Sequence, residues 1–277
     1  MKNHLSVCVL GSSSSGNSTV IWNDTTSILI DCGHGPVFLE ERLKELDLSL
    51  RGLDAVFITH NHSDHVNETT VRNLHKYCIP IHCPAAIETP LVKKYRSLAA
   101  VKKENFLFPF TDPNVDVSGM TIRAFAVPHD SEGGCFGYSV SDISNGTVRK
   151  ISVATDMAEV TASAVDELAD SDVVVIESNY DAEMLERSGR PGWLKDRIRI
   201  GGHLSNEQCA EGILRIIQQS KQPPKVFALA HISKECNTNG LAHDCTAGAL
   251  QQHGITNVAV FETYPQRSSR TMTVRKA

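Results

Sequence analysis

One short segment of the chain concentrates side chains that bind metal ions. Residues 60–65 contain His60, His62, Asp64 and His65. They follow the apolar run 54–59, whose length and β-rich composition predict a buried strand. Two histidines two positions apart on such a loop can bind one metal, and the Asp-His pair beyond them can reach a second. These ligand types suit zinc, manganese or iron. The alternative is a polar turn that is merely rich in histidine.

Three further candidate ligands each stand at the end of a predicted strand. They are His129 after 120–127, Asp156 after 149–155 and His231 after 225–230. A sheet holds the side chains at its strand ends rigidly, as metal geometry requires. A single histidine after a strand is more often structural. Three such residues together with segment 60–65 favour a metal centre.

A second group of residues points to proton transfer. His203 precedes a predicted helix, and Ser205 and Gln208 have the spacing of a capping box. The N-terminus of a helix favours an anion, and a histidine there can donate a proton to a phosphate or a leaving alkoxide. Glu177 ends another predicted strand. The alternatives are a surface histidine in a loop and a solvated strand end.

The elements that must position these residues alternate along the chain. Strands are predicted at 5–10, 19–22, 27–31, 54–59, 79–83, 120–127, 135–141, 149–155, 172–177, 225–230 and 257–262. Helices are predicted at 36–46, 68–77, 84–97, 160–169, 206–219 and 240–252. Strands grouped in each half with helices between them indicate two sheets with helices outside. We therefore expect a single α/β domain over 1–277, a four-layer αββα sandwich.

Composition sets limits on the class of protein. The 277 residues, 41% hydrophobic and 21% charged, are typical of a globular protein. A net charge of −5 provides no global positive field for nucleic acid but permits a local basic groove. The eight cysteines form no C-x-x-C pair and are expected to be reduced thiols. We see neither a signal peptide nor a membrane-spanning run and expect a cytoplasmic protein without membrane association.

With these residues in place, the chain resembles the metallo-β-lactamase-fold hydrolases over nearly its full length. The resemblance implies two divalent ions, Zn²⁺ first, with Mn²⁺ or Fe²⁺ also compatible. It assigns His60, His62 and His129 to the first metal, Asp64, His65 and His231 to the second, and Asp156 to a bridge. Common β-lactamases have a cysteine where this chain has Asp156, which disfavours β-lactam hydrolysis. Two metals sharing a carboxylate can hold a hydroxide nucleophile between them.

Four segments resemble more specifically the WalJ (YycJ) type of bacterial metal-dependent nucleases. They are 10–18, 179–185, 202–206 and 230–237, with Cys236 where that group leads us to expect Asn. The resemblance implies a 5′ exonuclease acting on DNA. The order of Glu177, His203 and His231 also resembles the tRNA 3′-processing branch of this fold, which implies that Glu177 orients His203. Catalytic roles are expected for Asp64, His203 and Glu177. Asp31 resembles a supporting residue of the superfamily that is not itself a ligand.

The serine-rich segment 11–18 nearly matches a nucleotide-binding P-loop. Asn17 stands where that motif needs Lys, and the β-branched residues that follow predict a strand where the motif needs a helix. ATP binding is therefore not expected. The donors of this loop could contact a phosphate, and a plain β-turn is equally compatible. The residues predicted to bind substrate are Ser13, Ser14, Asn17, Ser205 and Ser233.

Basic residues cluster just before His203, around Trp193. They are Arg187, Arg190, Lys195, Arg197 and Arg199. The arginines could hold phosphates while Trp193 stacks on a base; the alternative is a solvated loop with one buried Trp. We expect phosphodiester hydrolysis on a nucleic acid, most simply DNA. The rivals are a small-molecule hydrolase of the same fold, acting on a thioester, lactone or small phosphodiester, and a redox di-metal protein. Metal identity, polarity and oligomeric state stay open.

Overall fold

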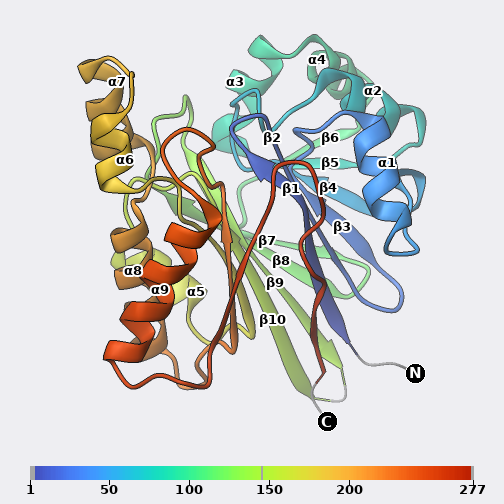
Figure 1. Cartoon of the computed structure of the whole chain (residues 1–277). Helices are drawn as coiled ribbons and strands as arrows, with labels where there is room; N and C mark the ends of the chain where they lie inside the picture. Colours follow the sequence, from blue (N-terminus) through green and yellow to red (C-terminus); the bar gives the residue numbers. More distant parts are fainter. Residues whose placement is uncertain (1–3, 145, 276–277) are drawn as a thin grey trace.

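Two β-sheets pack face to face in the centre of the molecule (Figure 1). The structure is a computed structural model that describes residues 4–144 and 146–275. The first sheet runs β14 (Met272–Val274), β1 (Leu5–Ser13), β2 (Gly16–Trp22), β3 (Ser27–Ile30), β4 (Ala55–Phe57), β5 (Ile81–Pro84), β6 (Leu107–Phe110). The second runs β13 (Ala259–Glu262), β12 (Val226–Ala230), β11 (Val173–Glu177), β10 (Thr147–Ala154), β9 (Cys135–Ser144), β8 (Met120–Val127), β7 (Asn114–Val117).

The central strands are apolar on both faces because both faces are covered. In β1, Val7 and Val9 join the core between the sheets, whereas Cys8 and Leu10 pack toward the outer helices. Successive side chains of a strand point to opposite faces, so a strand buried on both sides reads as a continuous apolar run. Strand β11 divides its residues between the two faces in the same way.

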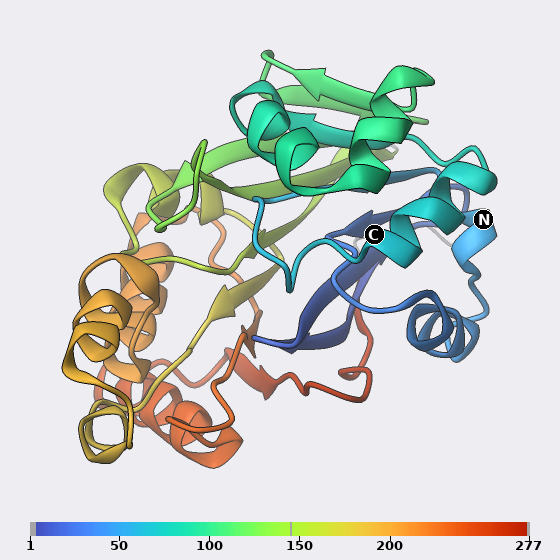
Figure 2. The ribbon, with the colours of Figure 1, turned by 90° about the horizontal axis from the view of Figure 1, so that it is seen from above.

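Helices form the two outer layers. The first sheet is covered by α1 (Pro36–Lys44), α2 (Glu68–Lys76), α3 (Ala85–Lys94) and α4 (Arg96–Lys103). The second is covered by α5 (Ala162–Leu168), α8 (Asn206–Gln219) and α9 (Asn239–Gln252). In Figure 2 the blue-to-green helices and the gold-to-red helices lie on opposite sides of the strands. The predicted four-layer αββα sandwich is thus confirmed. In the described part of the chain, the helices lack the length and apolar character needed to cross a membrane.

Several elements differ from the prediction. The helix expected over 84–97 is two helices, because the backbone of Tyr95 is extended, with φ −114° and ψ 114°. The Tyr95 hydroxyl donates a hydrogen bond to the Asn61 carbonyl at 3.0 Å, so a long-range contact accompanies the break in the helix. The 3₁₀ turn η1 (Leu50–Gly52), the helices α6 (Ala182–Arg187) and α7 (Gly192–Arg197), and the edge strands β6, β7 and β14 were not predicted. They are too short for a clear period.

Candidate metal centre

The predicted ligands converge at one end of the sandwich. The loop after β4 supplies segment 60–65, and residues just past β8, β10 and β12 supply the others. Among the described residues, three groups form in which all ligand atoms lie within 4.8 Å of one another: His60, His62 and His129; Asp64, His65, Asp156 and His231; and Asp156, Glu177, His203 and His231. All seven predicted ligands are therefore brought together from four strands.

Three strand ends turn sharply into this site. Asp31, Asp156 and His231, which follow β3, β10 and β12, have φ values of 59°, 59° and 54°. Residues other than glycine rarely adopt this left-handed conformation, which costs free energy unless neighbouring bonds hold it. For His231, the backbone N–H donates to Ser12 Oγ at 2.8 Å and the carbonyl accepts from Asn179 Nδ2 at 2.7 Å.

Hydrogen bonds to Nδ1 fix the orientation of three imidazoles. His65 donates to Asp31 Oδ2 at 2.6 Å, His129 to the Gly202 carbonyl at 2.7 Å, and His231 to Glu177 Oε1 at 2.7 Å. Each bond leaves Nε2 as the atom available for a metal. Asp31 thus supports a proposed ligand, as its resemblance implies.

Unpartnered atoms test whether the residues fit metal ions. Within the described residues, His60 Nε2, His231 Nε2 and Asp156 Oδ2 are buried and make no hydrogen bond, and His231 Nε2 lies 3.4 Å from Asp64 Oδ2. Asp156 Oδ2 lies 3.1 Å from His65 Nε2, within ion-pair distance. Buried polar atoms without hydrogen bonds are costly and uncommon in folded proteins. Coordination to a divalent cation would satisfy all three, so the donor set fits the metal that the fold implies.

The electrostatics of the two groups differ. Burial lowers the pKa of His60, of His129 and of His62, the last to about 4. These imidazoles are therefore neutral and able to coordinate. Burial also disfavours charge on His65, but its carboxylate neighbours, Asp31 first, raise its pKa well above the usual value. The negative field that holds a proton there also attracts a divalent cation.

Glu177 and His203 form a second constellation beside the ligands. The Nδ1 of His203 donates to Glu177 Oε1 at 2.9 Å, and Glu177 Oε2 accepts the N–H groups of Met157 and Leu204, both at 3.0 Å. Burial would raise the pKa of Glu177, but the imidazoles of His203 and His231 lower it to about 2. Glu177 is therefore an anion that fixes His203 and leaves its Nε2 free to face a substrate.

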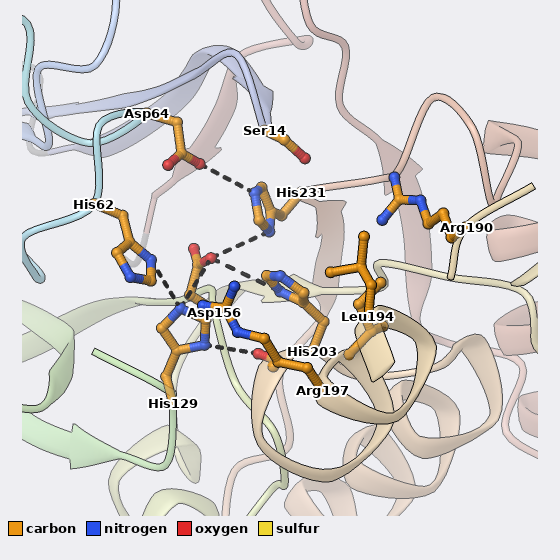
Figure 3. Close-up of a pocket in the computed structure, with 12 residues that line it drawn as sticks. Ser14, His62, Asp64, His129, Asp156, Arg190, Leu194, Arg197, His203 and His231 are labelled. Atoms are coloured by element: carbon orange, nitrogen blue, oxygen red, sulfur yellow. Dashed lines mark hydrogen bonds and ion pairs between the residues drawn. The ribbon is translucent and has the colours of Figure 1, made fainter. Parts of the chain in front are cut away.

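These side chains line one cleft of about 200 Å³ (Figure 3). His62, Asp64, His129, Asp156 and His231 form its metal-ligand wall, and His203 lies beside them. Ser14 also lines the cleft, as do Arg190, Leu194 and Arg197, from the segment that carries α7. A phosphate in this cleft would meet proposed metal sites, a proton donor and two guanidinium groups.

The serine-rich loop contacts residues of the proposed metal centre. Ser12 Oγ accepts from the His231 backbone and donates to Asn17 Oδ1 at 2.8 Å, and Asn17 Nδ2 donates to Asp64 Oδ2 at 3.1 Å. The loop therefore links two proposed ligands of the second metal group. Asn17 is buried, and only Ser14 among the predicted substrate-binding residues lines the cleft. As expected, strand β2 follows the loop where a P-loop would need a helix.

The other predicted contacts of substrate are also occupied locally. Ser13 Oγ accepts from the Ser15 N–H at 3.1 Å, and Ser233 Oγ accepts from the Cys236 N–H at 3.1 Å. Ser205 caps α8 with the predicted capping box. All three are buried, so they shape the loops around the site. The alternative of a buried Trp193 is excluded, since this side chain is 68% exposed.

A buried amide network joins segments that sequence reasoning did not connect. Asn237 Nδ2 donates to the carbonyls of Ser178 and Asn179, both at 3.1 Å, and to Asn206 Oδ1 at 2.8 Å. The network pins the loops that follow β11 and β12 against the start of α8. Its three asparagines, Asn179, Asn206 and Asn237, belong to the segments 179–185, 202–206 and 230–237, and that shared resemblance was the signal that could have identified them.

Comparison with known families agrees with this fold and site. Residues 26–232 match the family model described as "Beta-lactamase superfamily domain". The chain therefore belongs to the β-lactamase superfamily. This fold and the His and Asp clusters indicate that the protein binds divalent metal.

Individual proteins are also similar to this chain in sequence or in structure. The chain is 30% identical to "Exodeoxyribonuclease WalJ" of Streptococcus pneumoniae, over 94% of this chain and 95% of that protein. It is 28% identical to "Exodeoxyribonuclease YycJ" of Bacillus anthracis, over 92% and 93%. The solved metallo-β-lactamase-fold protein YhfI of Bacillus subtilis superposes with a TM-score of 0.68 at 14% identity, over 98% of this chain and 100% of that one. The predicted resemblance is confirmed.

Proposed function

We propose that this chain is a metal-dependent exodeoxyribonuclease that hydrolyses phosphodiester bonds from the 5′ end of DNA. The observation that carries the proposal is the juxtaposition in one cleft of the metal ligands, His203 and two arginines. The names of the WalJ and YycJ relatives, similar over more than nine-tenths of the chain, support a DNA substrate. Their resemblance also implies attack from the 5′ end.

Two divalent ions are proposed, with Zn²⁺ first and Mn²⁺ or Fe²⁺ as alternatives. One would be held by His60, His62 and His129, the other by Asp64, His65 and His231, and Asp156 would be shared. When bound, such ions activate water at neutral pH and neutralise charge on the phosphate.

The chain's own residues would handle the leaving group. His203 lies at the cleft with its Nδ1 bonded to buried Glu177, so the Nε2 position can deliver a proton to the leaving oxygen. The Glu177 anion holds the His203 ring in place through this bond. Asp64, held by Asn17, keeps its other contacts toward the second metal group.

The shape of the cleft favours a polymer over a small molecule. Its volume of about 200 Å³ lies below the roughly 300–1,000 Å³ of pockets that enclose a whole small ligand. A phosphodiester with one neighbouring group fits, and the remainder of the substrate must extend outside. A thioester or lactone substrate would leave Arg190 and Arg197 without a phosphate to bind. A polyanion would provide phosphates for both.

A labelled-DNA assay tests the proposal. The purified protein with Mn²⁺ or Zn²⁺ should shorten single- or double-stranded DNA, and excess chelator should stop the reaction. DNA labelled at the 5′ end should release a labelled mononucleotide early, whereas DNA labelled at the 3′ end should shorten gradually. Hydrolysis of a thioester or lactone without cleavage of DNA would overturn the assignment in favour of the rival. Faster cleavage of RNA would correct the substrate.

A further inference from the structure

The segment between β11 and α8 covers one rim of the cleft and carries five basic residues. We call residues 182–202 the arm; they comprise α6, α7 and the π-helical turn η2 (Ile198–Gly202). Figure 1 shows α6 and α7 at the outer edge of the molecule, apart from the layers of the sandwich. Few apolar side chains hold the arm in place. Its buried cluster contains Tyr180, Leu185, Ile198 and Cys236, with Leu194 packed against it.

The structure separates the basic residues of the arm into two sets. Arg187 pairs with Glu183 on α6, while Arg199 and Lys195 bond to Glu186. These three stay within the arm, and they do not line the cleft. The other two, Arg190 and Arg197, do line it.

Arg190 and Arg197 reach the loops that carry metal ligands. Arg190 bonds to Glu235 at 3.0 Å, four residues after His231, and Arg197 bonds to Asp130 at 2.6 Å, next to His129. Figure 3 shows the two side chains at the rim, Arg197 beside His129 and Arg190 on the side of His231. The two guanidinium groups therefore flank the ligand cluster on different sides.

Both ion pairs are of a kind that a phosphate can displace. The carboxylates of Glu235 and Asp130 are each 56% exposed. Exposed pairs contribute little to stability, and a guanidinium binds phosphate through the same paired donors that bind carboxylate. In the free protein the two carboxylates hold the arginines at the cleft, where a phosphate could replace the carboxylates.

Apolar surface beside these arginines completes the pattern. Trp193 is 68% exposed and precedes Arg197 by four residues on the continuous helical stretch, so the two lie on one face. Ile200, farther along the arm, is 81% exposed. An indole next to a cationic groove is the arrangement by which proteins stack the bases of a single strand.

We propose that the arm is the strand-binding element of this enzyme: Arg190 and Arg197 hold phosphates next to the scissile bond, and Trp193 stacks on a base leaving the cleft. The ligand class is a single-stranded DNA end. This inference rests on the proposed nuclease function, and it assigns the grip on the polymer to residues separate from the proposed metal ligands.

Steady-state kinetics on a labelled single-stranded oligonucleotide tests the arm. Arg190→Ala and Arg197→Ala should each raise KM about tenfold or more, the loss expected for a hydrogen bond to a charged group, with a smaller change in kcat. Trp193→Ala should also raise KM about tenfold.

The salt dependence of binding gives a second measurement. In the variant that lacks both arginines, the slope of log binding constant against log salt should be smaller in magnitude by about 1.4, since each phosphate contact on a single strand contributes about 0.7. Arg187→Ala is the matched control and should change neither quantity.

Glu235→Gln separates phosphate binding from a merely structural role. If the Arg190–Glu235 pair only braces the arm, Glu235→Gln should weaken DNA binding as Arg190→Ala does. If Arg190 binds phosphate, removal of the competing carboxylate should lower KM. Metal content and melting temperature, measured for each variant, show that the protein is folded. Equal KM values for Arg190→Ala, Arg197→Ala and Arg187→Ala, or a raised KM for Glu235→Gln, would overturn the inference.

A small phosphodiester substrate distinguishes failure of the arm inference from failure of the proposed nuclease function. If the unaltered protein cleaves neither bis(p-nitrophenyl) phosphate nor DNA with Mn²⁺ or Zn²⁺, the proposed function fails and the arm inference with it. If it cleaves DNA but the arm variants behave like Arg187→Ala, only the arm inference fails.

Discussion

The strand ends that carry the proposed metal ligands and the arm above them are built in opposite ways. His65, Asp156 and His231 are almost fully buried, and hydrogen bonds to Asp31 and Ser12 fix His65 and His231. The arm has a small apolar cluster and holds its cleft-facing arginines by exposed ion pairs. The proposed metal ligands are thus held rigidly, whereas the arginines proposed to bind substrate are held by contacts that a substrate can replace. Each prediction below tests one side of that contrast.

The largest effect is expected at the shared ligand. Asp156→Ala should remove metal and reduce phosphodiesterase activity by more than the roughly 10–100-fold that loss of a supporting residue costs, because this carboxylate lies in the second ligand group and is proposed to be shared with the first. Metal analysis and turnover of DNA measure the two effects. Asp244→Ala, at an exposed position, is the control. Full metal content and full activity in Asp156→Ala would contradict the assigned site.

Loss of His203, the proposed proton donor, should lower turnover without changing metal content. His203→Ala should lower kcat about 10²- to 10⁴-fold, the usual contribution of general acid–base catalysis, with metal content unchanged. His203 contacts Glu177 and lines the cleft, but it is not one of the seven proposed ligands. His243→Ala, on exposed α9 surface, should behave like the unaltered protein. Loss of metal in His203→Ala would make this residue a ligand.

Substitution of Asp31, which supports the proposed ligand His65, should have an intermediate effect on metal affinity. In Asp31→Asn the amide can present N–H where Oδ2 accepts from His65 Nδ1 at 2.6 Å, so the imidazole orientation is no longer enforced. Metal affinity should fall about 10–100-fold. Titration with a competing chelator measures the affinity. Asp24→Asn, the same substitution in a surface pair with His4, is the control, and equal affinities would exclude a supporting role for Asp31.

The smallest effect is expected in the arm. Asp130→Asn removes the partner of Arg197 but should change the free energy of unfolding by less than about 1 kcal/mol, because exposed pairs contribute little. Denaturant unfolding measures this value. A loss of several kcal/mol would show that the arm is held as rigidly as the strand ends, and the contrast would fail.

Much of the fold was predictable because its signals are local. Apolar runs bounded by polar turns marked the central strands, and Ser205 with Gln208 marked the start of α8. The break at Tyr95 and the edge strand β14 were not predictable in this way. The first coincides with a hydrogen bond to Asn61 and the second depends on pairing with β1, at the other end of the chain.

The sequence by itself determined the chemistry: histidine and aspartate at strand ends, a capped helix after His203, and a basic segment beside Trp193. Only the tertiary structure decided which groups cooperate. It bonded the serine-rich loop to Asp64 and His231 and placed its Ser14 at the cleft, and it placed two of five basic residues there. The reason is that residue type and spacing fix local conformation, whereas a bond such as Ser12 to His231 joins positions 219 residues apart and forms only when the two sheets have packed.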